Sequence, residues 1–530
     1  MERTPIIPAA VIAAVLLSFP AAAHQGAGAR LGKVHFQVEC NAAAQREFNV
    51  AMAYYHSFAW SQMQAPLERT LQADPACGMA HWLRTLAALN NPFAWPGVIS
   101  QAVLEEGPRF LRTARDAGLR SQRERDYVDA LAVFFKDTDK LDHRTRAKAL
   151  EGGLEEVMQR HPADSEAATL YALILSANFN PADKKYTNQL KAARILEPIF
   201  AAQPEHPGVA HYLIHSYDYP PIARQGLDAA RRYGGIAPDA PHALHMPSHI
   251  FTRVGAWKES VESNRASARA GGDKTFDQWH AYDYMVYAHL QLGQDAEARK
   301  VVTEALGNPA RIDHGATAYA YAAMPARLAV ERGAWRDAAA LPLMPADNFP
   351  WKKYTFAEAI NAYARGIGAA MSGDAPAARA QGERLEALGK ATKLPYWAEE
   401  IAIQAAVVRG LALCAEGERG ACLDGLRAAA DREDASEKHV VTPGRLLPAR
   451  ELLAYAILES GDGKVALREF QRVLERDPNR LRAFAGAARA AEAAGDRVEA
   501  SRYASLLVDL TAGADTALGE VAYAKRMIGK

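Results

Sequence analysis

The sequence predicts an all-α protein built as a solenoid of helix–turn–helix repeats. Helical periodicity begins near Phe48, and the alternation typical of β-strands is hard to find after it. Turn signals separate apolar-periodic segments of roughly ten to seventeen residues. Equivalent residues also recur 34 positions apart, as in Pro204 and Pro238 or Gly461 and Gly495. A constant period of this length is typical of stacked repeats.

A glycine marks the end of the first helix in many of the predicted repeats. It occurs in the motifs RVGAWKES, QLGQDAEAR, ERGAWRDAA and MSGDAPAAR, at Gly255, Gly293, Gly333 and Gly373. Glycine suits such a turn because it adopts a positive φ without a Cβ clash. A small residue follows five positions later, where two helices must approach closely: Ser260, Ala298, Ala338 and Ala378. We expect roughly nine to eleven hairpins of this kind.

The N-terminus has the pattern of a secretory leader. An apolar run from Pro5 to Phe19 is followed by Pro20-Ala21-Ala22-Ala23, which predicts a signal peptide over 1–23 with cleavage after Ala23. We therefore expect a periplasmic or secreted protein. No later run of about 18 apolar residues occurs, so the mature chain should have no membrane span. Residues 24–46 are expected to form an irregular segment ahead of the repeats.

The first repeat, FNVAMAYYHSFAWSQMQAPLERTLQADP, has small residues where two helices would cross and ends in Asp74-Pro75. It resembles the tetratricopeptide repeat, a 34-residue helical hairpin closed by proline. The resemblance is strongest over 207–308 and 447–510, and it implies a right-handed superhelical solenoid. The predicted organisation is N-terminal helical repeats over 47–206, tetratricopeptide repeats over 207–308, helical repeats over 309–446, and C-terminal repeats with a capping helix over 447–530.

Three longer motifs resemble those of a group of bacterial exported tetratricopeptide-repeat proteins of unassigned function. In this chain they are HxxIHxxD at 211–218, HMPSHIFTRVGAW at 245–257 and VTPGRLLPARE at 441–451. The resemblance supports the fold and the export, and it implies no reaction.

Composition excludes several common functions. Lys+Arg and Asp+Glu both number 62, so the chain lacks the basic excess that a general nucleic-acid binder needs. We find no phosphate-binding glycine loop after a strand, no GxSxG motif and no CxxC pair.

The four cysteines form two candidate disulfides, Cys40 with Cys77 and Cys414 with Cys422. Each pair could equally consist of free thiols, because the sequence does not show whether the Cα atoms are close enough.

Histidines are concentrated between His206 and His289, which hold eight of the chain's 16. His211 and His215 are four residues apart, and His245 and His249 repeat this pair 34 residues later. In the tetratricopeptide register both pairs occupy positions 5 and 9 of their repeats. The resemblance implies that positions 2, 5, 9, 12 and 13 line the concave groove. The groove would then carry these four histidines with Asp218, His242, Arg253, His280, Asp283, Tyr287 and His56.

This pattern favours a transition-metal site. Two histidines at i and i+4 share one helix face, and imidazole nitrogen suits zinc, copper or iron. We predict that His211, His215, His245, His249 and Asp283 bind a divalent transition metal. The further groove residues, Asp218, His242, His280, Tyr287, Arg253 and His56, would orient these ligands or contact what binds beside them. The number of donors fits either one ion with an outer shell or two ions.

Two other interpretations of the histidines remain open. The groove could bind a peptide or protein partner without metal, since repeat arrays commonly act as such scaffolds. The histidines could also form a structural hydrogen-bond network, which is the usual role of a single buried histidine. Whether the protein is an enzyme stays open at this point, and Asp218, Asp283 and Tyr287 are the only acid–base candidates for a catalytic metal.

Overall fold

The computed structural model describes residues 28–272 and 275–529, and within these ranges every regular element is a helix. Consecutive helices pack as antiparallel hairpins that stack side by side, which confirms the predicted TPR-like solenoid. The predicted signal peptide at 1–23 lies outside the described residues. None of the described helices combines the length and apolar character needed to cross a bilayer.

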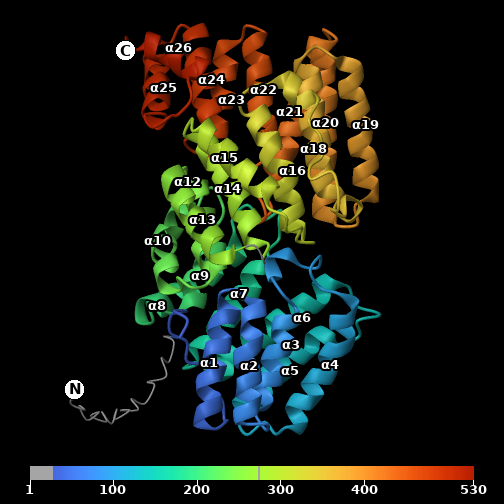
Figure 1. The fold of residues 1–530 in the computed structure, drawn as a ribbon, viewed down its shortest axis with the longest axis vertical. Coiled ribbons are helices and arrows are strands. Elements are labelled where there is room, and N and C mark those ends of the chain that lie inside the picture. Colours follow the sequence, from blue (N-terminus) through green and yellow to red (C-terminus); the bar gives the residue numbers. More distant parts are fainter. Residues whose placement is uncertain (1–27, 273–274, 530) are drawn as a thin grey trace, which may run out of the picture.

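The chain coils into two layers joined by a middle section (Figure 1). The N-terminal layer holds α1 (Ala42–His56), α2 (Trp60–Ala73), α3 (Gly78–Ala88), α4 (Gln101–Asp116), α5 (Gln122–Ala132), α6 (His143–Arg160) and α7 (Ser165–Ala177). The middle section holds α8 (Thr187–Ala202), α9 (Pro207–Tyr217), α10 (Leu227–Ile236), α11 (Pro241–His245), α12 (Pro247–Val254), α13 (Trp257–Gly271), α14 (Asp277–Gln291) and α15 (Asp295–Gly307).

The C-terminal layer lies above these helices in Figure 1. It contains α16 (Gly315–Val330), α17 (Trp335–Ala339), α18 (Thr355–Met371), α19 (Ala375–Ala391), α20 (Pro395–Ala415), α21 (Arg419–Ala435), α22 (Ala449–Glu459), α23 (Gly463–Arg476), α24 (Leu481–Ala493), α25 (Arg497–Leu510) and α26 (Gly519–Met527). Short 3₁₀ helices are η1 (Pro92–Ala94), η2 (Val133–Phe135), η3 (Ala223–Gly226) and η5 (Trp351–Lys353).

The turn glycines behave as predicted. Gly255, Gly293, Gly333 and Gly373 all have positive φ, between 62° and 83°. At Gly255 the missing side chain also permits a long-range contact, because a Cβ there would lie 2.4 Å from the carbonyl oxygen of Pro478. This glycine is therefore needed both for the turn and for the approach of the C-terminal repeats.

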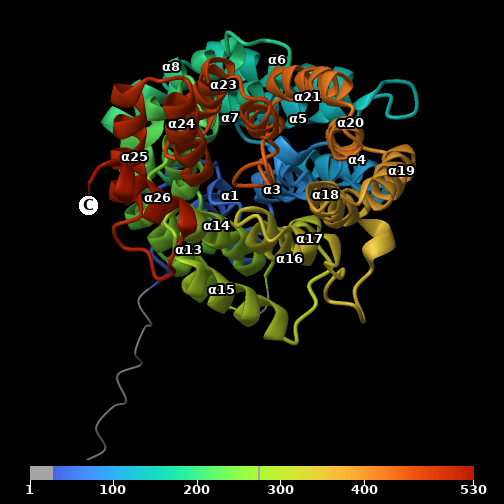
Figure 2. The same cartoon turned by 90° about the horizontal axis from the view of Figure 1, so that it is seen from above.

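The superhelix closes because its C-terminal repeats return to pack against the middle section (Figure 2). The indole nitrogen of Trp257 donates to the Asn479 carbonyl at 2.8 Å, and the Asn479 amide donates to the Gly255 carbonyl at 3.1 Å. Backbone amides of Ala296 and Glu297 donate to the Asp515 carboxylate at 3.0 Å. The concave face of the predicted solenoid is consequently an interior and not an open groove.

The N-terminal segment is irregular from residue 28 to residue 41, and it packs against the first repeats. Phe36 is completely buried, and its ring lies 5.5, 5.4 and 5.0 Å from those of Phe48, Trp82 and Tyr127. Helix α1 begins at Ala42, before the predicted start at 47, because the Asn41 side chain caps it by accepting from the amides of Ala43 and Ala44.

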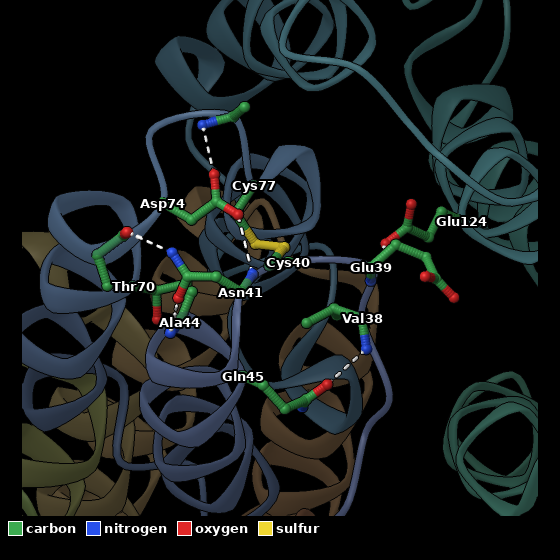
Figure 3. Close-up of a disulfide and its surroundings, with 12 residues drawn as sticks. Val38, Glu39, Cys40, Asn41, Ala44, Gln45, Thr70, Asp74, Cys77 and Glu124 are labelled. Atoms are coloured by element: carbon green, nitrogen blue, oxygen red, sulfur yellow. Dashed lines mark hydrogen bonds between the residues drawn. A yellow bond between two sulfur atoms is a disulfide. The ribbon is translucent and has the colours of Figure 1, made fainter.

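Both predicted cysteine pairs are disulfide-bonded in the structure. Cys40 and Cys77 join the N-terminal segment to the start of α3, with Cα atoms 5.3 Å apart (Figure 3). The Asp74 carboxylate accepts from the Asn41 amide at 2.9 Å beside this bond. Cys414 and Cys422 join α20 to α21 with a Cα separation of 5.1 Å.

Candidate metal centre

Six histidines of the middle section form two compact groups in the interior. The first histidine triad is His211, His215 and His242, and the second histidine triad is His245, His249 and His280. In each triad, one ligand atom from each ring lies within 4.8 Å of the other two. All six side chains are buried, with exposures of 0 to 8%.

The repeat geometry builds both triads in the same way. Each takes the histidines at positions 5 and 9 of one repeat and the histidine at position 2 of the next. Thus α9 supplies His211 and His215, while the start of α11 supplies His242. Proline at 247 divides α11 from α12, but Met246 keeps helical dihedrals of −54° and −35°. His245 and His249 therefore remain one helical turn apart on a continuous path, and α14 supplies His280.

Hydrogen bonds fix the rings of the second histidine triad so that lone pairs face each other. His245 Nδ1 lies 2.6 Å from Asn264 Oδ1, and His249 Nδ1 lies 2.9 Å from Asp218 Oδ2. Asn264 uses its amide nitrogen to donate to the Ser260 carbonyl at 2.7 Å, so its oxygen can only accept from His245. Both Nδ1 atoms thus carry protons, and both Nε2 atoms carry lone pairs.

The two Nε2 atoms of His245 and His249 are only 3.1 Å apart. Burial lowers the pKa of His249 to about 4 and that of His245 well below its usual value, so neither ring brings a second proton near neutral pH. Two acceptors at this distance repel unless a cation lies between them. The Nδ1 atom of His280 is also buried and makes no hydrogen bond.

In the first histidine triad, a hydrogen bond fixes the tautomer of His211 in the same way. His211 Nδ1 donates to the backbone carbonyl of His56 at 2.7 Å, which leaves its Nε2 unprotonated. The Nε2 atoms of His211, His215 and His242 are all buried without a hydrogen bond. His242 Nδ1 lies 3.6 Å from the Asp277 carboxylate. Unpartnered buried nitrogens are costly, and here three lie in one place.

The two i,i+4 pairs belong to different groups of ligand atoms, because His211 and His215 lie with His242, and His245 and His249 lie with His280. The rings of His215 and His249, one from each triad, have centroids 6.0 Å apart, so the two groups are adjacent. The number of donors left open one ion with an outer shell or two ions, and this grouping corresponds to the second arrangement. His242 and His280, predicted as supporting residues, are the third members.

Asp283 belongs to neither triad. Its carboxylate oxygens accept from Arg327 Nε at 2.8 Å and Nη2 at 3.4 Å, and both side chains are fully buried. Tyr287, which was predicted to line the groove, also pairs with an arginine of the C-terminal layer. Its hydroxyl accepts from Arg480 at 3.1 Å. These side chains hold the C-terminal layer in place, so the structure does not bring Asp283 to the predicted metal position.

Asp218 contacts the second histidine triad through the Nδ1 atom of His249. Besides His249, its carboxylate accepts from Arg253 Nε at 2.7 Å and lies 3.4 Å from Lys438 Nζ. Burial raises the pKa of Asp218, but the positive charges of Lys438 and Arg253 lower it by more than burial raises it. The pKa of Asp218 is therefore held well below its usual range. An ionised Asp218 makes His249 a better metal ligand by polarising its Nδ1–H bond.

The 436–448 segment, which the predicted set of site residues does not include, also contacts the centre. Lys438 is buried, and burial lowers its pKa to about 8. The Tyr284 hydroxyl donates to the Thr442 carbonyl at 3.1 Å and lies 3.4 Å from His249 Nε2. The sequence Glu437-Lys438-His439 was a visible signal, but only closure of the superhelix brings it to the histidines.

Two cavities adjoin the triads. One, of about 480 Å³, is lined by His215, His242, His249 and His280. A second cavity of about 640 Å³ shares His215 and His439 with it. The histidines predicted to line a groove are thus buried residues in or beside the cavity walls.

His56 lies in a separate buried cluster with Glu166 and His206. Its Nε2 is 3.0 Å from Glu166 Oε2, and its Nδ1 is 2.9 Å from the Tyr212 hydroxyl. His206 accepts from the Val209 amide through Nδ1 at 3.2 Å and reaches Glu166 Oε1 through Nε2 at 3.0 Å. Every ring nitrogen in this cluster has a partner.

No protein-family model and no curated protein matches the chain. Among solved structures, the APC/C hetero-tetramer Cut9–Hcn1 matches at 13% identity over 84% of this chain and 76% of its own, with a TM-score of 0.34. Naa15/Naa10 bound to HypK-THB matches at 11% identity over 92% and 73%, with a TM-score of 0.25. A circular tandem repeat protein matches at 13% over 92% and 98%, with a TM-score of 0.13. These TM-scores are too low to indicate a function for this chain.

Proposed function

We propose that this helical-repeat protein binds two divalent transition-metal ions, one in each histidine triad, and presents them to a small molecule in the interior cavity. The observation that carries the proposal is the 3.1 Å approach of His245 Nε2 and His249 Nε2, whose Nδ1 protons are both committed elsewhere. With metal–nitrogen bonds of about 2.0–2.1 Å, two ligands of one ion lie about 2.9–3.4 Å apart for bond angles between octahedral and tetrahedral.

The donor chemistry narrows the choice of metal. Each triad offers only imidazole nitrogen, and no thiolate lies in either group. Such sites favour copper(II) and zinc over iron(II) in intrinsic affinity. Three protein ligands leave a coordination position free, which is the pattern of catalytic and not of structural metal sites. Because four of the six ligands line one cavity, a metal-dependent reaction on a small molecule is the role that the proposal favours.

Metal loading of the purified full chain tests the proposal. After removal of metal with a chelator, titration with Zn²⁺ or Cu²⁺ should saturate at two equivalents, measured by elemental analysis after desalting. His211→Ala/His215→Ala and His245→Ala/His249→Ala should each retain one equivalent. His35→Ala/His81→Ala, which removes two histidines outside the triads, should retain two. Loading that none of these variants changes, or no loading at all, would sink the proposal.

Export stays part of the proposal. The predicted cleavage after Ala23 would place the mature chain in the periplasm or outside the cell, and N-terminal sequencing of the purified protein should then begin at His24.

A further inference from the structure

The cavity beside the triads has an aromatic wall. Besides the triad histidines, the cavity is lined by Phe58, Trp60, Phe276, Tyr354, Phe356 and Trp397. Phe356 and Trp397 stack with centroids 4.5 Å apart and planes inclined by 17°, which gives the wall a flat element. A volume of about 480 Å³ accommodates a molecule of one or two rings. The shape and lining therefore suit a planar apolar body.

The same cavity contains two histidines whose polarity is opposite to that of the triads. His314 Nδ1 accepts from the Ala316 amide at 3.2 Å, and His439 Nδ1 accepts from the Val441 amide at 3.1 Å. Burial lowers the pKa of His314 to about 4 and that of His439 to about 3, so both rings are neutral. In each ring the proton is therefore on Nε2, which makes that nitrogen a donor to an oxygen atom.

Apart from the proposed metal ions, the described side chains that line the cavity carry no net charge. Among the described residues that line the cavity, Asp313 and Lys353 are the only Asp, Glu, Lys or Arg side chains, and they pair with each other at 2.9 Å. The Tyr354 hydroxyl also donates to Asp313. A neutral ligand loses less hydration than an ion on entering such a site.

We propose that this cavity binds a small neutral aromatic compound bearing a hydroxyl group, a molecule of the phenol class. Its ring would lie against Phe356 and Trp397, and its oxygen would face the metal-binding triads and the histidine donors. This inference rests on the proposed function, because the triads supply the metal that the oxygen would contact. It names the class of molecule on which the metals would act.

Equilibrium dialysis of the full-length, metal-loaded protein tests this assignment with two probes of similar size, phenol and cyclohexanol. Phenol should bind at least about 10-fold more tightly, since only its ring can stack and only its hydroxyl is acidic enough to ligate a metal well. Phe356→Leu and Trp397→Leu should each weaken phenol binding by about 2- to 10-fold while the metal content is unchanged. Phe110→Leu, on α4 and outside the cavity, is the matched control and should change neither quantity.

The outcomes separate this inference from the proposed function. Two metal equivalents with equal affinity for phenol and cyclohexanol, or no effect of either wall variant, would overturn the aromatic assignment alone. Absence of metal would refute the metal centre, and a preference for phenol in the same metal-free protein would still support the aromatic cavity. Weaker phenol binding after metal removal, with the affinity for cyclohexanol unchanged, is the result that supports both.

Discussion

Two kinds of buried histidine cluster lie next to each other in this protein, and they differ in how their nitrogens are used. In the cluster of His56, Glu166 and His206, one carboxylate accepts from both rings, and the remaining Nδ1 atoms pair with Tyr212 and the Val209 amide. The triads are equally buried and only a few residues away. They contain no carboxylate, and three Nε2 atoms of the first triad have no partner.

The difference shows that burial alone does not identify a metal site. A buried imidazole is stable when each nitrogen has a partner of the opposite polarity. In the triads, acceptors at Nδ1 such as Asn264 and Asp218 force the lone pairs inward. All ring nitrogens of the His56 cluster are paired within the protein, whereas the inward lone pairs of the triads are the basis on which we propose metal binding there.

The largest effect that this comparison predicts is acid instability of the metal-free protein. Burial lowers the pKa of His249 to about 4, and it lowers those of His211, His215, His245 and His280 well below their usual value. The unfolded chain therefore binds more protons than the folded protein below about pH 6.5, so stability falls as the pH falls from 6.5 towards 4. His249 alone would cost about 3 kcal/mol by pH 4.

Urea unfolding of the metal-free protein at pH 7.5, 6.0 and 5.0 measures this effect. The variant His245→Gln/His249→Gln, which cannot take up protons at these positions, should show a shallower decline. A free energy of unfolding that stays constant from pH 7.5 to 5.0 would mean that the triads are already protonated or paired.

A smaller effect is expected from Glu166→Gln in the fully paired cluster. Burial raises the pKa of Glu166, but the rings of His206 and His56 lower it by more than burial raises it. The Glu166 carboxylate is therefore ionised near neutral pH. The amide would present an N–H group to one of the two imidazole N–H groups, at a cost of about 1–3 kcal/mol in the free energy of unfolding. Metal content should stay at two equivalents.

The matched control for this variant is Glu47→Gln, which removes a partly exposed ion pair with Arg69. It should change the free energy of unfolding by about 0.5 kcal/mol or less. A Glu166→Gln protein that loses metal would contradict the division into paired and metal-binding clusters.

Local chemistry explains which parts of the fold were predictable. The turn glycines and the 34-residue period fix each hairpin through contacts within it, so the solenoid and the i,i+4 pairs could be predicted. The third ligand of each triad depends on how far neighbouring repeats are offset, which the period does not contain. His242 and His280 were accordingly placed in the outer shell.

Long-range closure explains the residues that were misassigned or missed. Asp283 shares repeat position 5 with His211 and His245, but Arg327 of the following repeat unit takes up its carboxylate. Lys438 reaches Asp218 across 220 residues only because small rotations between many repeats add up to a closed superhelix. Neither contact leaves a periodic trace in the sequence.

Effects comparable to or smaller than that of Glu166→Gln should come from the carboxylates near the two triads, and their sizes should differ between the triads. Asp218 Oδ2 lies 2.9 Å from His249 Nδ1, whereas Asp277 Oδ1 lies 3.6 Å from His242 Nδ1, too far for a good hydrogen bond. Asp218→Asn should weaken metal binding by the second triad about 10- to 100-fold. Asp277→Asn should weaken the first triad by less than about 10-fold.

Each substitution is best measured in the background where only one triad can load. Asp218→Asn belongs in His211→Ala/His215→Ala, and Asp277→Asn in His245→Ala/His249→Ala, with affinity read by competition against a chromophoric chelator. Exchanging the backgrounds gives the controls, because Asp218→Asn should leave the first triad unaffected. If both substitutions weaken both triads alike, the two ions are coupled through shared ligands, and the centre is a single binuclear unit instead of two neighbouring sites.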